Sequence, residues 1–293
     1  MKNSLQSYLK ESAHHGTKEF PAAFYEAQVP LHFRDMLVHW HEEMEFTKVA
    51  SGTLHYDIDQ VPYALKEGDI LLIGPDTLHA ACQIGEEPAQ TNTIVFHLQL
   101  TGLETADSCT KRYIQPLREG ILRIPPVLHP GDALYPEIDA CFDAMWECEA
   151  ETMPYRELRF KSKAFELMQY IWQHSAGKVQ QMPTRTFRQY EDKLKLALAY
   201  IQEHYSEPIT IAQLAQLCGF SQVHFMNIFK AAIGSTCIEY LVKYRLAHAA
   251  MDLQETDHSI MQIALDNGFQ NTSYFNRAFK GQYGMTPSAY RKK

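Results

Sequence analysis

Three histidines and one glutamate are the residues best suited to chemistry in the N-terminal half of this chain. His39 and His41 are separated by one residue, Glu45 follows, and His79 lies further along. Imidazole nitrogens and carboxylate oxygens are suitable ligands for a divalent metal, and both groups hydrogen-bond small organic molecules. The four residues could therefore bind an organic effector or a metal ion, or they could be hydrogen-bonded core residues.

Short β-strands are expected to position these side chains. Between 38 and 100 the sequence contains period-two alternation, as in 53–59, and short apolar runs such as 69–73. If His39 and His41 lie on one strand, both side chains point to the same face. Regularly spaced short strands without a helical period between them predict a small barrel or jelly roll.

A second set of residues, in the C-terminal half, is suited to contacting DNA. Arg277 can bind guanine O6 and N7, and Asn227 or Asn276 can pair with adenine. Lys230 and Lys280 are placed to approach the sugar-phosphate backbone, and a solvated side chain is the alternative at every position. The predicted DNA-binding residues are Gln222, Val223, Met226, Asn227, Lys230, Thr272, Ser273, Asn276, Arg277 and Lys280.

These residues belong to a helical unit that occurs twice. Residues 210–215 and 259–264 each begin with a hydroxyl residue three positions before a Gln, which predicts a capping box. Each helix then stops at a Gly-Phe pair, at 219–220 and 268–269. Helix, glycine-containing turn and second helix is the plan of a helix-turn-helix, whose second helix enters the DNA major groove. A plain helical bundle is the alternative, but it does not explain two matching caps and turns.

This C-terminal segment resembles the AraC/XylS family of bacterial transcription regulators. The resemblance includes the closing run 284–291, Gly-Met-Thr-Pro-Ser-Ala-Tyr-Arg. It implies that a long helix joins the two units and fixes their spacing. Apolar residues at helical spacing support such a helix. They are Ile238, Leu241, Val242, Leu246, Ala249 and Leu253.

The front half resembles the cupin pattern of His-x-His, Glu, Gly and a later His, with Gly52 as the glycine. It departs from the second cupin motif, because Gly74 and Asp76 stand in place of Pro-x-Gly and Gln83 in place of Asn. In the AraC-like sensors that this half resembles, such residues often lie in an effector pocket without a catalytic metal. We therefore expect a small-molecule effector, carbohydrate-related by resemblance, and neither a metal nor a cofactor. The predicted effector-binding residues are His39, His41, Glu45 and His79.

Charge is divided unevenly along the chain, whose total is −8. Residues 1–175 carry 14 Lys and Arg against 26 Asp and Glu, whereas residues 176–293 carry 13 against 9. An acidic front and a basic back suit a sensor joined to a DNA-binding end. The six cysteines form no Cys-x-x-Cys pair, and there is no apolar signal region or membrane-length run, so a reduced, cytoplasmic protein is expected.

Helical spacing at 139–149 and 155–174 predicts two helices that pack on the barrel, and resemblance to sugar-responsive family members implies that they also pair two subunits. The predicted architecture is α+β. A cupin-like β-barrel with a helical dimerisation segment occupies 1–175, a linker with Gly177 and Pro183 occupies 176–189, and an all-α double helix-turn-helix domain occupies 190–293.

The sequence contains no nucleophile and base constellation, no nucleophile elbow and no phosphate-cradling Gly-rich loop, which argues against an enzyme. We predict a homodimeric transcription regulator that is controlled by a small-molecule effector. The expected partners are operator DNA, the effector and RNA polymerase, with no membrane. The alternatives are a metal-dependent cupin enzyme or metal sensor fused to a DNA-binding domain, and a constitutive DNA-binding protein with an inert barrel.

Overall fold

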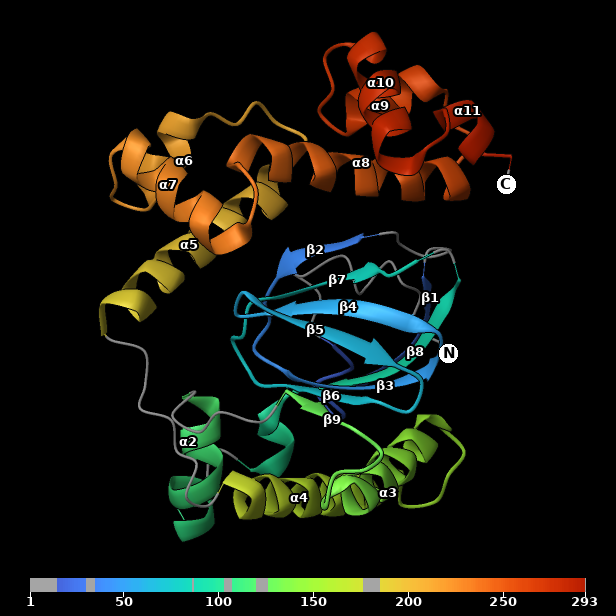
Figure 1. Ribbon diagram of the computed structural model, residues 1–293, viewed down its shortest axis with the longest axis vertical. Helices are drawn as coiled ribbons and strands as arrows, with labels where there is room; N and C mark the ends of the chain where they lie inside the picture. Colours follow the sequence, from blue (N-terminus) through green and yellow to red (C-terminus); the bar gives the residue numbers. More distant parts are fainter. Residues whose placement is uncertain are drawn as a thin grey trace. The chain divides into compact units, whose positions relative to one another are not determined.

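The computed structural model divides the chain into two compact units, Met1–Met182 and Pro183–Lys293. The structure describes residues 15–29, 35–85, 87–102, 107–119, 126–175 and 185–292. The first unit carries the strands and the second is helical (Figure 1), which confirms the predicted α+β class. The predicted domain boundaries stay predictions. Helix α5 (Arg185–His204) begins within the expected linker, and 176–184 lies outside the described residues.

The strands of the first unit form two antiparallel sheets. One has the order β1-β8-β3-β6-β9 and the other β2-β7-β4-β5. The strands are β1 (Ala22–Val29), β2 (Asp35–His39), β3 (Met44–Ser51), β4 (Thr53–Ile58), β5 (Val61–Lys66), β6 (Ile70–Ile73), β7 (His79–Gln83), β8 (Ala89–Phe96) and β9 (Val127–Leu128). Side chains from both sheets share one apolar cluster, which includes Val49, Leu54, Leu71 and Ala81. The interior between the sheets is therefore a core of this unit.

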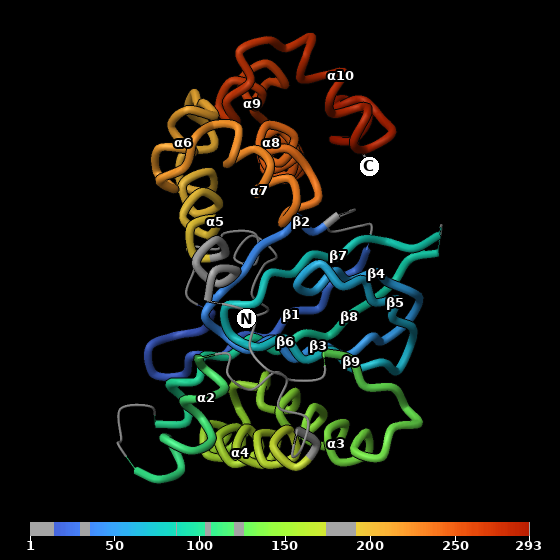
Figure 2. The backbone as a smooth tube through the Cα atoms, turned by 60° about the vertical axis from the view of Figure 1, so that its left-hand side comes forward, coloured from blue at the N-terminus to red at the C-terminus, as the bar shows by residue number. Residues whose placement is uncertain are grey.

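Strand β6 does not alternate between apolar and polar residues, because other parts of the unit pack on both of its faces. Leu71 and Ile73 belong to the core between the sheets, whereas Ile70 and Leu72 pack into a second cluster with residues of α3 (Tyr135–Trp146) and α4 (Arg156–Ser175). Both views show these two helices side by side against the outer face of the first sheet (Figures 1 and 2). The shorter helical segments of the unit are η1 (Leu98–Thr101), η2 (Thr110–Ile114), α2 (Gln115–Arg118) and η3 (Glu147–Glu149).

Helix α4 has one buried and one exposed apolar face. Phe160 and Leu167 are fully buried against the sheet and α3, as the expected packing on the barrel requires. Leu158 is 69% exposed and Phe165 is 39% exposed, although both belong to the apolar pattern that predicted the helix. The two exposed residues are seven positions apart, so they share one face of the helix.

The second unit consists of helices that follow the predicted repeat. They are α5, α6 (Ile211–Leu217), α7 (Gln222–Ile233), α8 (Cys237–Glu255), α9 (Ile260–Asp266), α10 (Thr272–Tyr283) and α11 (Pro287–Tyr290). The long connecting helix is α8, and Leu241, Leu246 and Leu253 of its predicted stripe are buried. Ile238 is 42% exposed, so it was wrongly included in that stripe. Within the described parts of the chain, no helix is both long and apolar enough to cross a bilayer.

Both predicted turns are present, and the helix caps match in part. Gly219 and Gly268 have φ angles of 68° and 79°, and each is followed by a Phe whose N–H donates back into the preceding helix. Thr210 forms a reciprocal capping box with its Gln. Ser259 accepts from the N–H of Gln262, but the Gln262 side chain donates to Asp266, so the second capping box is incomplete.

Candidate functional site

His39, Glu45 and His79 meet in the interior between the two sheets. Glu45 lies on β3 of the first sheet, and it shares an inward face with Val49 because successive strand residues alternate. His39 and His79 lie on β2 and β7 of the second sheet, where they are paired directly. His41 also reaches the cluster, but it lies in the loop after β2 rather than on the strand. The expectation of one strand carrying both histidines is therefore wrong.

The four side chains form a compact buried cluster. Glu45 is 0% exposed, and none of the three histidines exceeds 8%. Glu45 Oε2 lies 3.3 Å from His79 Nε2 and 3.6 Å from His41 Nε2. One ring nitrogen from each histidine lies within 4.8 Å of the others. Because the ring nitrogens and the carboxylate are this close together and this deeply buried, the space between them suits an ion or a shared proton better than an organic molecule.

Backbone carbonyls orient all three imidazoles in the same way. The Nδ1 atoms of His39, His41 and His79 lie 2.9, 3.1 and 2.9 Å from the carbonyl oxygens of Leu37, Glu43 and Thr77. A carbonyl oxygen only accepts, so each Nδ1 carries the hydrogen and a neutral ring has its lone pair on Nε2. The Nε2 atoms of His41 and His79 are buried without a hydrogen-bond partner.

Electrostatics within the cluster favours neutral His39 beside an ionised Glu45. Burial, together with His79 and His41, lowers the pKa of His39 well below its ordinary value. Burial alone would raise the pKa of the Glu45 carboxyl, but His41 and His79 beside it hold that pKa well below its usual range. A buried carboxylate in this state needs a compensating positive charge.

Further polar residues around the cluster were missed from the sequence. Tyr56 on β4 is fully buried, and both burial and nearby Glu45 raise its pKa well above the ordinary value. Thr47 donates to Glu45 Oε1 at 2.9 Å. His15 is buried, hydrogen-bonds Tyr25 and lies edge-on to His41. The period-two alternation of β4 could have indicated Tyr56, but no sequence signal connects His15 with the cluster.

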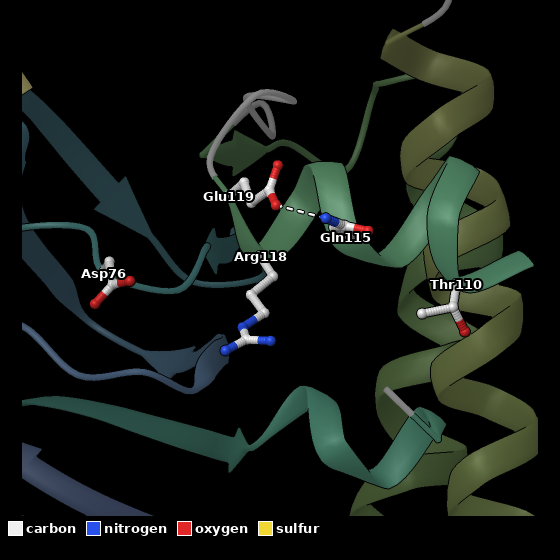
Figure 3. A pocket seen from close by; sticks show the side chains of 5 residues that line it. All are labelled: Asp76, Thr110, Gln115, Arg118 and Glu119. Atoms are coloured by element: carbon white, nitrogen blue, oxygen red, sulfur yellow. Dashed lines mark hydrogen bonds between the residues drawn. The ribbon is translucent and has the colours of Figure 1, made fainter. Parts of the chain in front are cut away.

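A polar cavity of about 530 Å³ lies in the same unit, and one of its lining residues, Asp76, contacts the backbone of His41. Asp76, at its edge, donates its backbone N–H to the carbonyl of His41 at 2.8 Å. In Figure 3, Arg118 extends from α2 into the space between α2 and the strands, and Gln115 donates to Glu119 at 2.7 Å. Thr110 is the remaining lining residue in the part of the chain that the structure describes. The lining thus offers hydroxyl, amide, guanidinium and carboxylate groups, and the four predicted effector residues lie outside it.

In the second unit, α7 and α10 present the predicted DNA-binding residues on one face. Phe225 and Phe229 of α7, and the matching Phe275 and Phe279 of α10, are fully buried. Burying one such ring contributes about 1.5–3 kcal/mol. Because these phenylalanines fix the inner face, the predicted positions lie outside. Gln222, Val223, Met226, Asn227, Lys230, Ser273, Asn276, Arg277 and Lys280 are exposed, and Thr272 is half-buried.

Helices α7 and α10 carry two further exposed residues that the sequence analysis overlooked. His224 precedes the first buried Phe of α7, and Tyr274 holds the equivalent position in α10. Both are exposed, and an imidazole or phenol can contact phosphate or a base edge. Their identical offset from Phe225 and Phe275 is the signal that could have found them.

Comparison with known proteins follows the same division of the chain. A family model described as an AraC-like ligand binding domain matches residues 21–168, and a helix-turn-helix domain model matches residues 214–293. The uncharacterized HTH-type transcriptional regulator YdeC of Bacillus subtilis is 24% identical over 298 residues, which span 100% of this chain and 99% of that protein. An HTH-type transcriptional regulator of Haemophilus influenzae is 26% identical over 84% of this chain and 85% of its own length.

A solved structure has a similar fold. ToxT from Vibrio cholerae matches with a TM-score of 0.51 over 92% of this chain and 98% of its own, at 12% sequence identity. At this identity the similarity concerns the order and arrangement of the elements, which agrees with a strand-rich N-terminal unit followed by a helical one.

Proposed function

Because this chain belongs to the AraC family of DNA-binding transcription regulators and has an N-terminal ligand-binding domain, we propose that a carbohydrate-related effector controls its binding to an operator. The observation that carries this proposal is the polar cavity of the N-terminal unit. Its volume of about 530 Å³ lies within the range of ligand pockets, about 300–1,000 Å³.

The chemistry of the cavity supports a polyol or sugar. Arg118 supplies only donors, Asp76 and Glu119 supply acceptors, and Gln115 and Thr110 supply both. Sugar hydroxyls both donate and accept, so such a ligand suits this mixture of donors and acceptors. The predicted effector role of His39, His41, Glu45 and His79 is kept as part of this proposal, since Asp76 of the cavity contacts the backbone of His41.

A screen of sugars, sugar phosphates and small acids by thermal unfolding tests the effector class. A specific ligand at 100 times its Kd should stabilise the protein by about 2.7 kcal/mol. Arg118→Ala should abolish that shift, whereas Arg112→Ala, an exposed arginine outside the lining, should leave it intact. Stabilisation only by compounds without hydroxyl groups would rule out a carbohydrate-related effector.

DNA recognition in this proposal uses the exposed faces of α7 and α10, with Arg277 reading a guanine and Lys230 and Lys280 contacting the backbone. The effector acts by favouring one arrangement of two subunits over another, since a ligand shifts an equilibrium only through differential affinity. Equal operator affinity with and without a bound effector would contradict this coupling.

Homodimerisation is proposed to occur through α4. Leu158 and Phe165 form an exposed apolar face on a helix whose other side is already packed, and a second copy of α4 would cover it. RNA polymerase is the proposed further partner if the regulator activates transcription. In vitro transcription with purified polymerase, with and without effector, distinguishes activation from repression.

A further inference from the structure

We propose that His39, His41, His79 and Glu45 form a binding site for one divalent transition-metal ion. This inference differs from the expectation of an organic ligand alone at these residues. It does not depend on the proposed effector control, because metal binding can be measured without DNA or effector.

The separations within the cluster approach those of a metal coordination sphere. Ligand atoms about 2.1 Å from a common ion stand about 3.0–3.4 Å apart in octahedral or tetrahedral geometry. Glu45 Oε2 is already 3.3 and 3.6 Å from two Nε2 atoms, one of His79 and one of His41. One ring nitrogen of each histidine lies within 4.8 Å of the others, so an ion bound by all three would draw these atoms closer together.

The proposed ligands also make the supporting hydrogen bonds that metal ligands usually make in proteins. Each histidine directs its Nδ1–H to a backbone carbonyl, which fixes the ring and turns the Nε2 atoms of His41 and His79 toward Glu45. Glu45 receives a hydrogen bond on Oε1 from Thr47, whose hydroxyl is also 2.8 Å from that of Thr93. The carboxylate is therefore oriented with Oε2 toward the histidines.

The poor hydrogen bonding of two buried histidine nitrogens supports the same conclusion. His41 Nε2 and His79 Nε2 are buried and make no hydrogen bond of good geometry, although both face Glu45 Oε2, and a buried polar atom in this state normally carries a cost of about 1–3 kcal/mol. A metal ion would satisfy both nitrogen atoms. Three imidazoles and one carboxylate favour ions such as Zn²⁺, Co²⁺, Ni²⁺ or Fe²⁺ over Mg²⁺ and Ca²⁺, which prefer all-oxygen sites.

Metal binding should be measured on the tag-free, full-length protein, since a polyhistidine tag would itself bind metal. After equilibration with Zn²⁺ or Co²⁺ and removal of free ion, elemental analysis should give about one ion per chain. The Co²⁺ form should show visible absorption bands of nitrogen and oxygen coordination. Equilibration with Mg²⁺ should leave no bound ion.

His79→Ala and Glu45→Gln should each weaken Zn²⁺ affinity at least tenfold, which is the lower end of the effect of removing even a supporting group. His55→Ala is the matched control, because His55 is a partly exposed imidazole on β4 of the same sheet, beside Asp57 and outside the cluster. Circular dichroism establishes that each variant is folded. The Co²⁺ spectrum of the wild-type protein serves as the test if a variant does not fold.

Less than about 0.1 ion per chain in the equilibrated wild-type protein would overturn the proposal. Unchanged Zn²⁺ affinity in folded His79→Ala and Glu45→Gln proteins would also overturn it, since the ion would then be bound elsewhere. Failure of the effector screen would leave these measurements unaffected, and a protein that lacks metal could still respond to a sugar. The two proposals are therefore separable.

Discussion

Two glycines that look equivalent in the sequence are expected to respond differently to alanine substitution. Gly219 and Gly268 end the first helix of each helix-turn-helix unit with positive φ. A β-carbon at 219 would meet only Lys193 Nζ, at 3.7 Å, among its surroundings. A β-carbon at 268 would lie 2.8 Å from the carbonyl oxygen of Ser206 and 2.9 Å from the guanidinium of Arg245. The second substitution therefore adds a steric clash to the backbone strain.

The structure sets the size of the difference. Alanine in the left-handed region costs about 1–2 kcal/mol, which is the whole expected effect of Gly219→Ala. Gly268→Ala adds overpacking of about 1–3 kcal/mol, for a total of about 2–5 kcal/mol. The clash falls on Arg245, which donates from Nε to Tyr205 O at 2.6 Å and from Nη2 to Glu207 O at 2.7 Å. These bonds connect α8 with the segment after α5. Displacement of Arg245 would therefore disturb the connection between the two helix-turn-helix units.

Urea unfolding of both full-length variants, followed by far-ultraviolet circular dichroism, measures the two costs, with wild-type protein as the reference. Gly268→Ala should lose at least about 1 kcal/mol more than Gly219→Ala. It should also bind a complete operator more weakly, because both helix-turn-helix units must be held at the correct spacing. Equal losses in the two variants would refute the reasoning, since Ser206 and Arg245 would then move aside without cost.

Three further predictions follow from exposure and burial. Arg277→Ala should reduce discrimination at one base pair by about 1–3 kcal/mol in a binding assay with systematically altered operators, whereas uniform weakening on every sequence would assign Arg277 to the phosphates. Leu158→Asp and Phe165→Asp should each convert a dimer to monomer in sedimentation at micromolar concentration, and an unchanged dimer would exclude the α4 face. Maleimide at pH 8 should label exposed Cys109 but not buried Cys141. Burial raises the pKa of the Cys141 thiol to about 11, so only about 0.1% of it is thiolate at this pH. Mass spectrometry of the labelled native protein checks this prediction.

Local signals predicted most of the helical unit. Side-chain caps, Gly-Phe turns and the buried phenylalanines act within one or two helical turns, so their effect is visible in a short stretch of sequence. The same offsets placed Asn276 and Arg277 on the exposed face. They did not identify Tyr274, because its aromatic ring resembles a core residue until the neighbouring helices are known.

The β-rich half was less predictable because its contacts depend on strand pairing. The sequence indicated several strands and selected His39, His41, Glu45 and His79, but it did not specify how they meet. The order β2-β7 sets His39 opposite His79, and the facing sheet brings in Glu45. The turn after β2 removes His41 from the strand and still directs its ring into the cluster.

The sequence by itself determined the repeated helix-turn-helix unit, the strand-rich N-terminal half and the residue types of the buried cluster, since each depends on local periodicity and composition. Only the tertiary structure decided that Gly268 faces Arg245 while Gly219 does not, and that the Nε2 atoms of two histidines lie buried beside one carboxylate. The physical reason is that clashes, burial and coordination depend on atoms brought close from distant parts of the chain, and no short stretch of sequence specifies those neighbours.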